Sequence, residues 1–370
     1  MILLPSEELT VRYDTIALRE LAASEWARWR EIQLEAPQLS SPYFCPEFAR
    51  CVADVRDDSR VCVLERDAQI VGFFPYQRKR LGVGGPIGGV VSDYHGLVAA
   101  ADLGCDTGKM LERCRLLAWE FDHVPVEQSA FARHHRVLAP SPTIDVSKGF
   151  DAYLEQLRRT GSSRLQQLRR KARKLEREVG PLRFEAHTDD PLVVRRVLQW
   201  KSEQCRRTGA SDFFDEHPCT RSLVTRIAAT QSEHFRGVVS ALWAGDELVA
   251  AHLGMCSHRA LHWWFPVYNR AFGRYSPGAL LLLRVVEHAA KSGLTLVDLG
   301  KGDDAYKSIF ANTEAMLAEG YVASHSLVSR IRDARDKTHR LIRTAAAPLR
   351  PAWRSVRRWM RPEPVPAPAT

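Results

Sequence analysis

Residues 260–283 read Ala260-Leu-His-Trp-Trp-Phe-Pro-Val-Tyr-Asn-Arg-Ala-Phe-Gly-Arg-Tyr-Ser-Pro-Gly-Ala-Leu-Leu-Leu-Leu283, and this stretch decides the fold around it. Its first nine residues are largely aromatic and typical of a strand, whereas its last six begin a run of helix formers. Between them, Ser276 and Pro277 suit the N-cap and the first position of a helix. The loop is therefore expected to present backbone N–H groups and the positive end of a helix dipole, which together favour an anion.

A second motif follows this helix. Ser292-Gly293 is expected to end it, and Leu294–Leu299 has the pattern of another strand. The next segment reads Gly300-Lys-Gly-Asp-Asp-Ala-Tyr-Lys-Ser-Ile-Phe310. It combines carboxylates, a tyrosine and a lysine, which are side chains that can take part in proton transfer.

The first loop resembles the pyrophosphate loop of the GNAT N-acyltransferases. In that family an Arg/Gln-x-x-Gly-x-Gly/Ala motif after the fourth strand wraps the CoA pyrophosphate, and Arg270-x-x-Gly273-x-Tyr275 matches all but its last position. The family also has a bulge in that strand, which parts from the fifth strand to admit pantetheine. Pro266 fits this feature, because a proline inside a strand requires an edge or a bulge. The alternative is that Arg270 and Arg274 are simply solvated.

The region is similar, more closely, to the CelD-like acetyltransferases linked to polysaccharide synthesis. Their landmarks are a tyrosine followed by Ser-Pro-Gly, an Asp-x-Gly-x-Gly-Asp segment and a Tyr-Lys-x-x-Phe segment. This chain meets them with Tyr268, Ser276-Pro277-Gly278, Asp298–Asp303, Tyr306-Lys307 and Phe310. These enzymes share a fold with the Fem-type aminoacyl transferases, which are the nearest alternative.

The resemblance implies transfer of an acyl group, most simply acetyl, to an amine on a sugar, an amino acid or an envelope or polysaccharide precursor. Acetyl-CoA or another acyl-CoA is then the co-substrate. Asp303 or Asp93 is the expected base. Tyr306 is the expected acid, and Lys307 is expected to orient the acceptor. The residues implied to contact the cofactor are Tyr268, Arg270, Gly273, Arg274, Tyr275, Ser276 and Gly278.

The cysteines and histidines do not indicate a metal site. No C-x-x-C pair, H-E-x-x-H motif, Walker loop or G-x-S-x-G elbow occurs in the sequence. His258 and His262 are four residues apart, and on an extended strand this spacing separates them by more than about 12 Å. We therefore expect free thiols and no metal in the reaction.

The first half of the chain repeats a pattern of the second half. Residues 60–74 and residues 237–251 each contain two β-prone runs around a polar turn, so each is predicted to form the central hairpin of one half. Residues 81–89 are rich in glycine but do not fit the dinucleotide fingerprint. They are expected to form a flexible turn.

Residues 92–96 read Ser-Asp-Tyr-His-Gly and resemble a stretch in the first half of the CelD-like enzymes. Asp93 and His95 together could accept a proton from an amine, and Tyr94 is then expected to contact the substrate. An equally good alternative is that Asp93 only caps a turn.

Length and composition favour a two-lobed α/β protein of tandem GNAT-like halves with a basic helical tail. The chain has 370 residues, 45% of them hydrophobic and 26% charged, which suits two globular domains of moderate size. The expected parts are an N-terminal half, basic connecting helices, an acyl-CoA-binding C-terminal half and the tail. Their expected ranges are residues 1–146, 147–180, 181–326 and 327–370.

Residues 161–179 are predicted to form a helix with one apolar stripe and arginines or lysines elsewhere. This helix is either solvated and packed by its stripe, or an anion surface for CoA phosphates, a nucleotide-linked sugar, lipid or tRNA. Lys201 lies on the next predicted helix, residues 191–208. It resembles a family lysine near the substrate, and a plain surface lysine is the alternative.

The net charge is concentrated in the tail. Residues 327–370 contain eleven Arg and Lys residues against three acidic residues, which accounts for +8 of the chain's +9. Trp353 and Trp359 alternate with arginines, as in helices that lie in a lipid headgroup layer. The tail is therefore expected to contact an anionic membrane surface, or alternatively to pack on the body. The chain shows neither a long uncharged apolar run nor a signal-peptide pattern, which predicts a cytoplasmic protein.

Two other functions stay open. A Fem-type enzyme would take its acyl group from aminoacyl-tRNA, and the basic helix would hold that RNA. A non-catalytic, GNAT-like accessory protein would have kept the fold and lost the cofactor site. DNA is not an expected partner, because the sequence shows no helix-turn-helix or zinc module.

Overall fold

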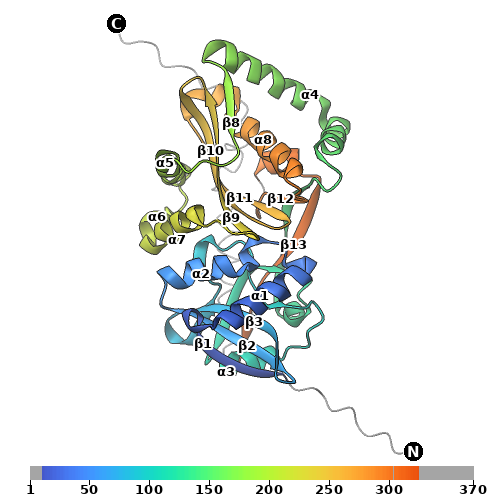
Figure 1. Cartoon of the computed structure of the whole chain (residues 1–370), viewed down its shortest axis with the longest axis vertical. Helices are drawn as coiled ribbons and strands as arrows, with labels where there is room; N and C mark the ends of the chain where they lie inside the picture. The colour runs from blue at the N-terminus through green and yellow to red at the C-terminus, as the bar shows by residue number, and fades with distance from the viewer. Residues whose placement is uncertain (1–10, 303, 325–370) are drawn as a thin grey trace, which may run out of the picture. The chain divides into compact units, whose positions relative to one another are not determined.

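The computed structural model describes residues 11–302 and 304–324, without the side chains of residues 160–162. The chain divides into two compact units (Figure 1). Unit 1 holds the described residues up to Ala139 and from Met316 onward, and unit 2 holds Pro140–Ala315. Asp303 and the tail lie outside the described residues, so the expectations for them stay predictions.

Unit 1 is a mixed sheet with helices packed on it. Its strand order is β1-β2-β3-β4-β6-β13, and the short strand β5 pairs with β3. The strands are β1 (Arg12–Ala17), β2 (Ser59–Arg66), β3 (Gln69–Arg78), β4 (Val83–Gly85), β5 (Val98–Ala99), β6 (Ala118–Pro125) and β13 (Thr313–Ala323), and the helices are α1 (Ala23–Glu35), α2 (Pro46–Val55) and α3 (Thr107–Arg113).

Unit 2 has the same plan and holds the region with the acyltransferase motifs. Its strand order is β8-β9-β10-β11-β12-β7. The strands are β7 (His135–Asp145), β8 (Leu182–Glu185), β9 (Phe235–Ala244), β10 (Glu247–Ser257), β11 (Ala260–Tyr268) and β12 (Leu296–Asp298). The helices are α4 (Phe150–Glu178), α5 (Pro191–Thr208), α6 (Phe213–Glu216), α7 (Pro218–Ala229), α8 (Pro277–Lys291) and α9 (Ala305–Phe310).

The two sheets correspond strand for strand, which confirms the tandem α/β halves. In unit 1 only β4 and β6 pair in parallel, and in unit 2 only β11 and β12 do so, among the pairings of the described strands. Both predicted central hairpins are present, as β2–β3 and β9–β10. A two-residue turn closes each hairpin, and Asp67, Ala68 and Gly245 adopt the positive φ that such turns require.

The sixth strand of each sheet comes from an unexpected part of the chain. In unit 1 it is β13, which pairs with β6 through Leu317–Ala323. In unit 2 it is β7, which precedes the basic helix and pairs with β12 through Thr143–Asp145. The units therefore differ from the expected ranges 1–146 and 181–326, because these two strands are exchanged between the sequence halves.

The glycine-rich segment 81–89 also differs from the expected flexible turn. Val83–Gly85 forms β4 and pairs in parallel with β6. A Cβ on Gly84 would lie 2.7 Å from Leu116 Cδ1, so the glycine is needed for close packing in the sheet.

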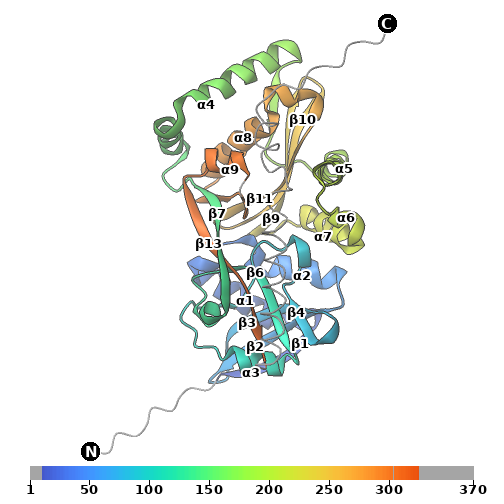
Figure 2. The same cartoon turned by 180° about the vertical axis from the view of Figure 1, so that it is seen from behind.

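Helices cover both faces of the unit 2 sheet. Helix α8 packs against β10 and β11 on one face, while α5 and α7 pack on the other (Figures 1 and 2). Helix α4 lies beside α8, and its predicted apolar stripe is buried at Leu165, Leu168 and Leu175. Within the described part of the chain, no helix has the length and apolar character needed to cross a membrane.

The close packing of β13 against β6 at Gly320 predicts that Gly320→Ala destabilises the protein. A Cβ at this position would overlap the His134 carbonyl oxygen and lie 2.9 Å from Phe121 Cζ. We expect a loss of about 1–3 kcal/mol in the free energy of unfolding, measured with urea and tryptophan fluorescence. Gly104→Ala is the control, because a Cβ there has no atom within 4 Å. Equal stability of the two variants would show that β13 is not held against β6 in this way.

Candidate active site

The strand, loop and helix of residues 260–291 form as predicted. Strand β11 ends at Tyr268, a 3-10 turn covers Arg270–Tyr275, and α8 begins at Pro277. The Asn269 side chain accepts a hydrogen bond from the Ala271 backbone N–H at 3.1 Å and so starts the 3-10 turn. The turn thus carries the chain from the end of β11 directly to the N-terminus of α8.

Strand β11 parts from β12 soon after the two strands meet. They pair at three positions only, from Ala260 opposite Leu296 to His262 opposite Asp298. On its other side, β11 changes register with β10 between Leu253 and Met255, which marks a bulge in β11. Pro266 lies beyond the last pair with β12, so the prediction of an edge or bulge is confirmed.

Ser276 starts α8 differently from the prediction. It has left-handed backbone angles, with φ 56° and ψ 50°, and its side chain does not cap the helix. Its hydroxyl instead accepts a hydrogen bond from Lys171 Nζ at 2.7 Å. The predicted side-chain cap is therefore wrong. Only the Ser276 carbonyl takes part in the first turn, accepting from the Ala279 N–H at 3.1 Å.

Tyr275, the departure from the GNAT motif, joins the loop to α4. Its ring is buried, and its hydroxyl donates to Glu178 Oε2 at 2.6 Å. The Arg274 guanidinium lies 4.7 Å from the ring centroid and donates to the same hydroxyl. Burial raises the pKa of Tyr275, and the hydrogen bond from Tyr275 lowers the pKa of Glu178. The Tyr275 hydroxyl thus holds the turn against α4, and its expected cofactor contact stays a prediction.

The remaining expected cofactor residues lie together around the turn. Arg270 and Arg274 are exposed, and Gly278 is in the first turn of α8. A Cβ on Gly273 would meet only Tyr268 Cε2, at 3.7 Å. The protein itself therefore leaves room at Gly273, and a requirement for glycine there would come from a ligand.

The segment after β12 is held at both ends by buried charged side chains. Asp298 Oδ1 accepts from the Gly300 N–H at 2.7 Å and from the Ser141 hydroxyl at 3.2 Å. Lys307 Nζ donates to the Gly300 and Lys301 carbonyls at 3.1 and 3.0 Å. Lys307 thus positions the loop, and its expected contact with the acceptor stays a prediction.

Tyr306 stands in the first turn of α9 and packs against the unit 2 core. Burial raises the pKa of its hydroxyl well above the usual value. The hydroxyl is therefore protonated at neutral pH, as the expected proton donor must be.

A splayed strand, a 3-10 turn and a helix N-terminus now define the candidate site, and known families can be compared with it. Residues 162–308 match the family described as "Acetyltransferase (GNAT) domain". This part of the chain is therefore similar to a GNAT acetyltransferase domain. The matched range contains Tyr268, Tyr306 and most of α4. It does not test the narrower resemblance to the CelD-like enzymes.

Solved structures agree with the GNAT fold. FemX is 10% identical, with a TM-score of 0.56 over 86% of this chain and 99% of that chain. The C-terminal DUF2156 domain of an Agrobacterium fabrum protein, described as a lysylphosphatidylglycerol synthetase, is 12% identical, with a TM-score of 0.52 over 83% and 95%. At these identities the likeness concerns the fold alone. No curated protein matches the sequence.

Lys201 lies on the face of the GNAT domain that α5 covers. Its ammonium is 5.7 Å from the centroid of the Phe265 ring. Helix α8, with the turn that precedes it, packs from the other face of the sheet. The structure therefore does not place Lys201 with the loop residues, and its substrate contact stays a prediction.

The candidate residues Asp93, Tyr94 and His95 belong to unit 1, not to the GNAT domain. His95 Nε2 accepts hydrogen bonds from the Asp122 and His123 backbone N–H groups, both at 3.1 Å. These bonds hold the His95 ring against β6, and the expected role of His95 as a base stays a prediction. Tyr94 is buried beside the ring of Tyr43, and its expected substrate contact also stays a prediction.

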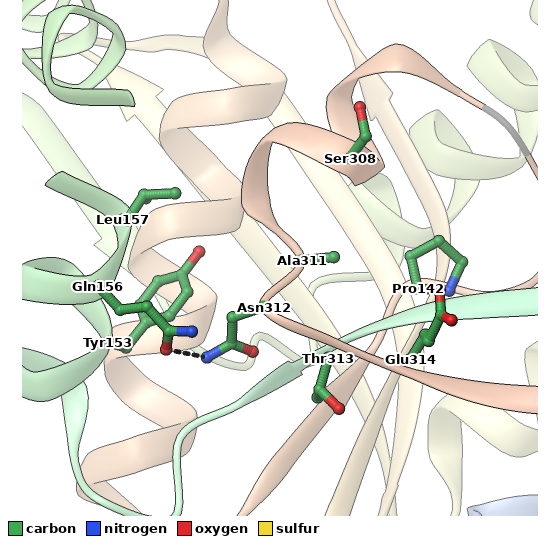
Figure 3. Close-up of a pocket in the computed structure, with 9 residues that line it drawn as sticks. All are labelled: Pro142, Tyr153, Gln156, Leu157, Ser308, Ala311, Asn312, Thr313 and Glu314. Atoms are coloured by element: carbon green, nitrogen blue, oxygen red, sulfur yellow. Dashed lines mark hydrogen bonds between the residues drawn. The ribbon is translucent and has the colours of Figure 1, made fainter. Parts of the chain in front are cut away.

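A cavity of about 510 Å³ lies between the first half of α4 and the segment that joins α9 to β13 (Figure 3). Its polar groups bond to one another. Asn312 Nδ2 donates to Gln156 Oε1 at 2.9 Å, and the Tyr153 hydroxyl donates to the Phe310 carbonyl at 2.9 Å. The cavity borders α9 at Ser308 and lies beside the segment that follows it, Ala311–Glu314. Among the described residues, no cluster of His, Cys, Asp or Glu is arranged to hold a metal ion.

His252, which the sequence analysis missed, supports the bulge in β11. It is fully buried on β10, and its ring stacks on Trp263 with centroids 4.1 Å apart. A Cβ on Gly254 would lie 2.5 Å from His252 Nε2, so glycine makes room for the ring. Burial lowers the pKa of His252 to about 3. The imidazole is therefore neutral in the folded protein.

This pKa predicts a pH dependence of stability. Because the folded value lies below the unfolded one, the contribution of neutral His252 is complete above pH 6.5 and is lost as pH falls toward 3. The loss should approach about 1.4 kcal/mol per pH unit. Urea unfolding between pH 7 and pH 4.5 should show a smaller loss for His252→Phe than for the wild type. His217→Asn, at an exposed histidine, should follow the wild type. Equal slopes for the wild type and His252→Phe would contradict the assignment.

Proposed function

We propose that the chain is an N-acyltransferase that moves an acyl group, most simply acetyl, from acyl-CoA to an amine. The observation that carries this proposal is the parting of β11 from β12 just before the turn into α8. The parted strands offer backbone to an extended pantetheine arm, and the N-terminus of α8 suits the pyrophosphate. Both features lie inside the matched GNAT domain.

The chemistry needs little beyond positioning and proton transfer. The amine attacks the thioester carbonyl carbon, a C–N bond forms, and the C–S bond breaks to release CoA thiolate. Tyr306 is the candidate that gives its proton to that sulfur, because its hydroxyl is protonated at neutral pH. The amine loses a proton to a base, for which Asp303 is the candidate. Lys307 holds the loop before α9 at the Gly300 and Lys301 carbonyls.

The resemblance to CelD-like enzymes supports an acceptor amine on a sugar, an amino acid or an envelope or polysaccharide precursor. Such acceptors are polar, and recognition would fall to side chains around the α9 segment. Acetyl is the simplest donor group.

A Fem-type reaction with aminoacyl-tRNA is the second candidate. The observation in its favour is the outer face of α4, which is rich in exposed arginines. These are Arg164, Arg169, Arg170, Arg173 and Arg177. Full turnover with acyl-CoA in the absence of tRNA would exclude it.

The CoA site predicts the behaviour of two loop variants. Arg270→Ala should weaken CoA binding by about 1–3 kcal/mol, because a charge-assisted hydrogen bond is lost. Gly273→Val should also weaken it, by blocking the approach of the pyrophosphate to the backbone. Isothermal calorimetry measures both affinities, and Arg284→Ala, on the exposed side of α8, is the control. Unchanged CoA affinity in both folded loop variants would remove the site from this turn.

The proton donor predicts a separation of turnover from binding. Tyr306→Phe should lower kcat roughly 10²- to 10⁴-fold while the Kd for CoA is unchanged. Asp303→Asn should do the same if this carboxylate is the base. Ser308→Ala is the control on α9, because its hydroxyl bonds only to the Ala305 carbonyl. Full activity of Tyr306→Phe would show that another group protonates the thiolate.

A further inference from the structure

Lys171 is a charged residue on the packed side of α4. It lies three residues after Leu168 and four before Leu175, and both leucines are buried. At helical spacing these three residues share one face, so Lys171 is directed toward the domain and not toward solvent. It is half-buried, and its Nζ reaches Ser276 Oγ at 2.7 Å, at the start of α8.

Among the described residues, no carboxylate neutralises the charge of Lys171. Its partner is a hydroxyl, and within residues 11–302 and 304–324 no carboxylate forms an ion pair with this ammonium. Lys174 and Arg177, on the same helix, both pair with Glu178, at 3.8 and 3.5 Å. Lys171 therefore differs from Lys174 and Arg177 in having no acidic partner in the described part of the chain, although it is the one of the three directed toward the domain.

The end of α8 makes this position unfavourable for a cation. The N-terminus of α8 carries the positive end of the helix dipole, which repels an ammonium. Burial adds to this effect and lowers the pKa of Lys171, whereas Arg274 in the preceding turn is paired with Glu178 at 3.6 Å. A bound anion would relieve this repulsion.

We propose that Lys171 of α4 is a ligand for the pyrophosphate of CoA. This rests on the proposed function and extends its site from the turn to a second helix. When CoA binds, Lys171 Nζ exchanges its hydrogen bond to the Ser276 hydroxyl for one to a pyrophosphate oxygen. The first backbone N–H groups of α8 donate to the same pyrophosphate. Pyrophosphate is favoured over the 3′-phosphate because it is the part of CoA expected at the helix N-terminus.

The test compares Lys171→Met with the wild type by calorimetry against CoA, dephospho-CoA and pantetheine. Methionine keeps the apolar stem and removes the charge. The variant should bind CoA and dephospho-CoA roughly 10- to 100-fold more weakly, as one lost charge-assisted hydrogen bond requires. Pantetheine, which has no phosphate, should bind both proteins equally. Arg173→Met, at an exposed position of α4, should behave as the wild type.

A thermal-melting measurement without ligand separates this role from a structural one. If Lys171 serves the anion, Lys171→Met should have an unchanged or higher Tm, because an unneutralised charge is removed. A lower Tm with equal weakening of all three ligands would make Lys171 a structural contact and overturn the proposal. Loss with CoA but not with dephospho-CoA would assign it to the 3′-phosphate and equally overturn it. If the wild type binds CoA and Lys171→Met binds it with the same Kd, the role of Lys171 is refuted and the proposed function stands. If the wild type does not bind CoA, the proposed function is refuted as well.

Discussion

The early end of the β11–β12 ladder is the constraint on which the rest of unit 2 depends. After His262 the two strands no longer pair. Strand β11 leads into the 3-10 turn, and β12 leads into the loop that Asp298 holds at Gly300. The parting is stable because buried side chains hold it. His252 and Trp263 stack at the bulge, and their burial offsets the lost backbone pairs.

Several charged and polar side chains around the site hold loops in place. Glu178 of α4 accepts a hydrogen bond from Tyr275 in the turn, and Lys307 donates hydrogen bonds to two carbonyls of the segment before α9. Buried polar groups of this kind are costly unless bonded, so each bonded group fixes one geometry. The result is a preorganised loop at the N-terminus of α8. Under the proposed function, which positions an activated thioester, such preorganisation matters more than many reactive side chains.

The exchange of β7 and β13 makes neither half of the sequence a self-sufficient sheet. Unit 1 needs Leu317–Ala323 from the end of the described chain, and unit 2 needs Thr143–Asp145 from before the basic helix. Removing β13 would leave the backbone groups of β6 unpaired along one edge, and removing β7 would do the same to β12. The final strand is thus a structural requirement of the first unit, although it follows the acyltransferase motifs in the sequence.

Local patterns in the sequence determined the elements of this protein and the neighbourhood of its site. The two hairpins, the apolar stripe of α4, the bounds 191–208 of α5 and the turn from Tyr268 to Pro277 depend on residues close in sequence, whose propensities and spacing are visible there. The tertiary structure alone decided which distant groups meet. Ser276 was expected to cap α8, but Lys171, 105 residues away, takes its hydroxyl. His95 was expected to be a base, and the fold brings two backbone N–H groups of β6 to its ring. The partner of a side chain and the neighbour of a strand depend on packing between segments far apart in the chain, and no local pattern encodes that.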